Sequence, residues 1–150
     1  MLRVRQHQGV TMLSVSIETA TLLARIAFVV GAVTDGLAVF PMLSRRLGAA
    51  LFGGDASRNS PEYRYAMGIG ASLMAGWTLL LFWGATSPIE RRDLLLLTVF
   101  PVITGIVVAT ALAVRRGVIR STRAIPLWIH LGALSLFYVA VYLLASPFAH

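Results

Sequence analysis

Asp35 and His130 stand out chemically, because each interrupts a long apolar stretch of the sequence. If these stretches are membrane-spanning helices, Asp35 lies about 12 Å and His130 about 8 Å from the same end of the bundle, at ~1.5 Å per residue. Ser72 and Thr110 fall at similar depths on two other stretches. An aspartate beside a histidine can form an ion pair or transfer a proton. These four residues predict a polar layer that binds a ligand. The structural alternative is a neutral or hydrogen-bonded Asp35 and an interfacial His130.

A second group of charged residues is expected near the opposite end of the helices. Glu18 and Arg25 are seven residues apart and therefore share one helix face. Glu90 and Asp93 follow the second apolar stretch and enter at a similar depth. Buried charges in membranes pair with one another, so we expect a structural ion pair between Arg25 and one of these carboxylates.

Several kinds of chemistry are excluded or disfavoured by the residues present. The chain has no cysteine, which excludes disulfides, thiolate metal sites and cysteine nucleophiles. His7 and His150 are close to the chain ends, so a bis-histidine haem site inside the membrane lacks a second ligand. No metal site is predicted, no catalytic residue is assigned, and the sequence does not indicate a cofactor.

The elements that must position these residues are four apolar stretches. Of 150 residues, 57% are hydrophobic and only 13% are charged, about half the usual share of charged residues in a soluble domain. Each stretch reaches the ~20 residues that cross the hydrocarbon core as a helix. The alternating pattern of a membrane β-barrel is absent. The sequence predicts an all-α, polytopic membrane protein, a single four-transmembrane-helix bundle over residues 1–150, with helices near 19–43, 65–87, 94–114 and 125–146. Residues 1–16 are expected to be flexible, and Met12 is an alternative start.

The distribution of arginine predicts the orientation of the helices. All thirteen basic residues are arginine, and the net charge is +7. Eight arginines lie in loops 44–64 and 115–124, against four on the side of the termini. The positive-inside rule therefore places these two loops in the cytoplasm and both termini outside a plasma (inner) membrane. The positive charge is expected to meet anionic lipid headgroups, and no nucleic acid partner is predicted.

Small residues and one proline indicate how the helices pack. Small residues recur at spacings of four, a pattern that lets membrane helices approach closely. Pro101 lies inside the third stretch and is expected to kink it, with Thr98 or Thr104 bonding to freed backbone groups. The small-residue sets are Ala27 and Gly31, Ala32 and Gly36, Gly68, Ser72 and Gly76, and Gly105, Ala109 and Ala113.

One stretch resembles a known type of membrane protein. The run GWTLLLFWGATSPIERRDLLLLTVFPVITG, residues 76–105, is similar in layout to small bacterial four-helix membrane proteins of the DoxX-like or BphX-like kind. There, a Gly-rich second helix ends at a short Pro/Arg turn before the third. The resemblance implies a four-helix fold and a bacterial source. It assigns no site residues.

These observations leave more than one function open. The leading interpretation is an accessory or assembly subunit of a membrane complex, with a membrane-protein partner or a second copy of the chain beside it in the lipid bilayer. The alternative is a bundle that binds an apolar small molecule, such as a quinone or lipid, through Asp35 and His130. An enzyme acting on such a molecule is a third possibility. A cavity reaching Asp35 and His130 would favour the ligand, whereas exposed small-residue faces would favour the subunit.

Overall fold

The computed structural model describes residues 16–52 and 60–148. Four helices are long and apolar enough to cross a membrane, and the third of these spans, Asp93–Arg115, is built from three consecutive elements. The prediction of an all-α four-helix membrane bundle is confirmed. The predicted flexible segment lies, except for Ser16, outside the described residues. The elements are α1 (Ile17–Leu43), α2 (Arg45–Phe52), α3 (Pro61–Thr86), α4 (Asp93–Leu97), η2 (Thr98–Ile103), α5 (Thr104–Arg115), α6 (Ser121–Ala145) and η3 (Ser146–Phe148).

Serine caps fix where the first two long helices begin. The Ser16 hydroxyl accepts a hydrogen bond from the Thr19 N–H (3.2 Å), and the Ser60 hydroxyl accepts one from the Tyr63 N–H (3.2 Å). Each cap satisfies one of the free N–H groups of a helix start, and Pro61 at the first position of α3 is already set to a helical φ. These local signals place α1 and α3 where the apolar stretches begin.

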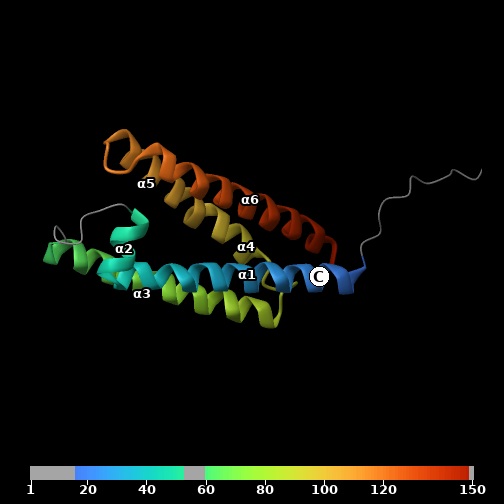
Figure 1. The fold of residues 1–150 in the computed structure, drawn as a ribbon. Helices are drawn as coiled ribbons and strands as arrows, with labels where there is room; N and C mark the ends of the chain where they lie inside the picture. Colours follow the sequence, from blue (N-terminus) through green and yellow to red (C-terminus); the bar gives the residue numbers. More distant parts are fainter. Residues whose placement is uncertain (1–15, 53–59, 149–150) are drawn as a thin grey trace, which may run out of the picture.

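Helices α1 and α3 pack side by side and antiparallel (Figure 1). Gly84 of α3 lies against the ring of Phe28, so closely that an added Cβ would lie 2.8 Å from Phe28 Cδ1. Further along the pair, Gly36 faces Thr78, whose Cγ2 would be 3.4 Å from an added Cβ. Two glycines thus let one helix backbone approach side chains of the other, as small residues do in membranes.

Helix α6 completes the buried core against α1. The largest fully buried side chains are Tyr138, Phe28, Leu81 and Leu95, which come from all four spans. Ala27, Gly31 and Ala32 of α1 are buried with them, which confirms the predicted packing face of the first helix. In Figure 1, α5 and α6 draw away from α1 and α3 toward the end of the molecule that carries α2.

The third span is kinked at η2, as Pro101 predicts. Phe100, just before the proline, has a non-helical backbone (φ −119°, ψ 110°). The Thr104 hydroxyl donates a hydrogen bond to the Val99 carbonyl (2.9 Å), and the Thr98 hydroxyl donates one to the Leu94 carbonyl (2.8 Å). The Thr104 bond reaches a carbonyl of the kinked segment, which lipid cannot solvate, whereas the Leu94 carbonyl also accepts the Thr98 N–H and is not freed by the kink.

Candidate functional site

Asp35 places a carboxylate inside the membrane-spanning part of α1. It lies eight residues before the end of α1 at Leu43, about 12 Å along the axis at ~1.5 Å per residue. Its side chain is half-buried, and the buried Oδ2 atom makes no hydrogen bond to any described residue. A charged side chain at the bilayer centre costs roughly 2.5–3.5 kcal/mol even on insertion scales. Asp35 is therefore a functional candidate on physical grounds.

Tyr138 of α6 is the polar neighbour of Asp35 in the interior. Its side chain is fully buried, and its hydroxyl contacts Gly31, one helical turn before Asp35 on the same face. The Tyr138 hydroxyl also lacks a hydrogen bond among the described residues. Two unpaired polar groups from two helices thus share one region of the core.

Sequence analysis missed Tyr138, although one signal was present. Tyr142 fits an aromatic belt near the helix end, but Tyr138 is seven residues before Ala145, about 10 Å inside the span. A tyrosine at that depth needs a hydrogen-bond partner, because burying an unpaired hydroxyl costs free energy. The position of Tyr138 in the sequence was therefore sufficient to make it a candidate.

Three of the four residues predicted to form the polar layer make no hydrogen bond to Asp35 in the described part of the chain. Ser72 is exposed and donates a hydrogen bond to the Gly68 carbonyl of its own helix (3.0 Å). Thr110 likewise donates to the Ile106 carbonyl (2.7 Å), and His130 is exposed. The reason is local, because serine and threonine in a helix satisfy their hydroxyl on the carbonyl four residues earlier. Of the four, only Asp35 has a buried, unpaired polar atom.

The depth of Ser72 also differs from the prediction. Thr78 is the residue of α3 that lies opposite Gly36, next to Asp35. Ser72 is six residues from Thr78, which is about 9 Å along α3. The depth of Ser72 was predicted by counting from a helix start near residue 65. Helix α3 begins at Pro61, one turn earlier, so the count started from the wrong residue.

No protein-family model, curated protein or solved structure matches this chain. The resemblance to DoxX-like or BphX-like proteins therefore stays a prediction. Function has to be argued from the surfaces and polar groups of the bundle itself.

The residues predicted to form the outer ion pair all lie at the surface of the described bundle. Glu18, Arg25, Glu90 and Asp93 are all exposed, and no ion pair joins them in the described ranges. The proposed pair thus rests on the sequence alone. Nor do the described residues hold a group of three or more His, Asp and Glu side chains that could bind a metal ion.

Two other arginines stabilise the turn between α3 and α4. The Arg91 guanidinium lies 3.7 Å from the centre of the Trp83 ring and donates hydrogen bonds to the Trp83 carbonyl and the Thr86 hydroxyl. The Arg92 guanidinium lies 5.6 Å from the Tyr142 ring centre. Arginine on an aromatic face is a stabilising cation–π contact. These contacts give the charged turn a structural role in joining α3 to α6.

Helix α5 presents an unpaired apolar face. None of its residues is buried, and its main contacts are with η2 and α6. A Cβ added at Gly105 would meet no atom within 4 Å, and Ala109 is exposed on the next turn. An open groove of about 690 Å³ runs along this face, lined by Phe100, Pro101, Thr104, Gly105, Val108, Ala109 and Leu112. The predicted small-residue face of the third span therefore points outward.

Proposed function

We propose that this chain is a small integral membrane protein that acts as an accessory or assembly subunit of a membrane complex, and that α5 is the face that meets the other subunit. The observation that carries the proposal is the exposure of α5, which buries none of its residues although α1 and α6 each bury six. A helix that contributes so little to its own bundle is free to pack against another.

The chemistry of the groove supports an apolar helix as the occupant. None of its lining residues is charged, and the lining is almost wholly apolar. Gly105 and Ala109 leave room for a backbone to approach closely, which is how membrane helices gain van der Waals contact. The kink at Phe100 and Pro101 opens the groove at one end. A transmembrane helix of a partner subunit fits this shape and polarity.

Co-purification with matched variants tests the proposal. The tagged chain is extracted from its native membrane in mild detergent, and membrane proteins that co-purify in stoichiometric amounts are quantified. Gly105→Leu fills the groove and is expected to reduce recovery of the partner at least tenfold. Gly76→Leu makes the same change at another exposed glycine of α3 with no atom within 4 Å of an added Cβ, and should retain the partner. Equal recovery with both variants contradicts the role of α5.

A second candidate function is supported by the interior polar pair. The unpaired Asp35 Oδ2 and Tyr138 hydroxyl are suited to hold the carbonyl or hydroxyl of an apolar molecule such as a quinone. In this version Tyr138 takes the place assigned to His130. Decylubiquinone should then raise the melting temperature of the wild-type protein but not of Asp35→Asn or Tyr138→Phe. An equal shift in all three proteins would rule out this pair as the binding group.

A further inference from the structure

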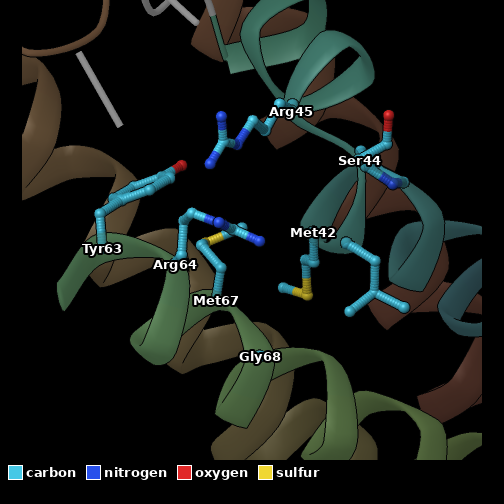
Figure 2. A pocket seen from close by; sticks show the side chains of 10 residues that line it. Met42, Ser44, Arg45, Tyr63, Arg64, Met67 and Gly68 are labelled. Carbon is cyan, nitrogen blue, oxygen red and sulfur yellow. The ribbon is translucent and has the colours of Figure 1, made fainter. Parts of the chain in front are cut away.

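A basic pocket lies where α1, α2 and α3 meet. Its volume is about 130 Å³, and its lining includes Arg45, Tyr63, Arg64, Met42, Met67 and Gly48. Figure 2 shows Arg45 reaching from α2 and Arg64 from α3 toward the same space, with the Tyr63 hydroxyl beside the Arg45 side chain. The pocket is thus bounded by apolar side chains and lined by two cations and the hydroxyl groups of Ser44 and Tyr63.

The backbone around this pocket is fixed by close packing. Ser44 ends α1 in an extended conformation, and its N–H donates to the Phe40 carbonyl (2.9 Å). The chain then turns into α2, where a Cβ on Gly48 would lie 2.8 Å from the Pro41 carbonyl oxygen. Glycine is therefore required for α2 to lie against the end of α1. This contact holds Arg45 over the start of α3.

Arg45 and Arg64 are exposed side chains that line one small cavity, and an anion bound between them relieves their mutual repulsion. No carboxylate of the described ranges forms an ion pair with Arg45 or Arg64. The cavity of about 130 Å³ has room for a small group of several heavy atoms. Arginine forks bind phosphate oxygens through paired hydrogen bonds. The charge and the hydrogen-bond donors of the pocket therefore suit a phosphate.

The position of the pocket indicates where that phosphate comes from. Pro41, Met42 and Leu43 are the last residues of the first span, so the pocket lies at the depth of the headgroups. We propose that the pocket formed by Arg45, Tyr63 and Arg64 binds the phosphate of an anionic lipid headgroup. This site is separate from the α5 face and stands whether or not that face binds a partner.

Native mass spectrometry of the full chain in mild detergent tests the site. The probes are dioleoylphosphatidylglycerol, dioleoylphosphatidylcholine and inorganic phosphate, each titrated separately. The wild-type chain should bind one phosphatidylglycerol tightly and phosphatidylcholine weakly. The double variant Arg45→Gln/Arg64→Gln should weaken phosphatidylglycerol binding ~25-fold, from a factor of about five for each arginine. Tyr63→Phe removes a hydroxyl donor and leaves the charge unchanged, and it should also weaken phosphatidylglycerol binding.

The control variant removes two positive charges outside the pocket, from the two loops predicted to lie on the same side of the membrane. Arg46→Gln/Arg116→Gln also deletes two exposed arginines, but neither lines the pocket, so the tight site should remain. An equal loss in both double variants would show nonspecific attraction and overturn the proposal. Tighter binding of inorganic phosphate than of phosphatidylglycerol would assign the site to a soluble ligand and overturn the lipid source.

Discussion

The hydroxyl of Tyr138 on α6 lies directly against Gly31 on α1, too close for any side chain at residue 31. An added Cβ there would also lie 3.1 Å from Leu81 Cδ1 of α3. Gly31 is therefore the point at which α1, α3 and α6 come together. The contact also places the Tyr138 hydroxyl one turn from Asp35.

The first prediction concerns this contact. Gly31→Ala should destabilise the bundle by about 1–3 kcal/mol, because the new methyl group forces Tyr138 out of its place. The measurement is thermal unfolding in detergent. Gly132→Ala is the matched control, since a Cβ at this exposed glycine of α6 meets nothing within 4 Å. A melting temperature for Gly31→Ala as high as that of the control would mean that Tyr138 does not pack here.

The second prediction concerns the bond between α3 and the kinked span. Trp77 Nε1 donates to the hydroxyl of Thr98, which is buried (3.3 Å). Thr98→Val keeps the shape but leaves the indole N–H unpaired, at a cost of about 1–3 kcal/mol. Thr110→Val removes a hydroxyl that bonds only within its own helix and should change stability by less than ~0.5 kcal/mol. Equal unfolding midpoints for the two variants would contradict a role for Trp77.

The third prediction decides whether Arg25 forms an ion pair. The structure leaves Arg25 exposed, so Arg25→Leu should change the unfolding free energy by less than ~0.5 kcal/mol. Loss of a buried pair would instead leave a carboxylate without its partner and cost several kcal/mol. Thermal unfolding in lipid nanodiscs distinguishes an exposed Arg25 from an Arg25 that forms a buried ion pair. A drop of that larger size would establish the ion pair expected from the sequence.

The fourth prediction concerns orientation. Eight arginines in loops 44–64 and 115–124 predict that these loops are cytoplasmic. The chain has no cysteine, so the labelling of a single introduced cysteine reports on that position alone. In intact cells an impermeant thiol reagent should label Glu90→Cys but not Val118→Cys, both at exposed positions. Both should react after permeabilisation. The reverse labelling pattern would invert the topology. Residues 53–59 of the longest loop, which include Arg58, lie outside the described residues.

The four spans and the kink could be predicted because they depend on local sequence. Apolar length defines a span, and Pro101 disrupts its own helix wherever that helix packs. Which face turns inward could not be predicted in the same way. Gly31 is buried whereas Gly76, on an equally regular small-residue pattern, is exposed. Lipid and core are both apolar, so these helices carry little of the amphipathic pattern that distinguishes inside from outside in water.

The same limitation explains the candidate site. Asp35 could be singled out because its charge is costly in lipid at any rotation of α1. The depth of Tyr138 made it a candidate as well, but its place near Asp35 could not be predicted, because it depends on the close approach of α6 at Gly31. Ser72, Thr110 and His130 were polar groups at plausible depths, but depth alone does not set the side of the helix on which a residue lies.

The most direct test of the central claim, that α5 meets another subunit, is site-specific photocrosslinking in the native membrane. A photoreactive residue at Val108, which lines the groove and is 52% exposed, is compared with one at Leu136, which is 75% exposed on α6 and does not line it. If α5 meets another subunit, Val108 should give a discrete protein adduct, and Leu136 should give lipid adducts without a protein adduct. Lipid adducts alone at both positions would contradict it.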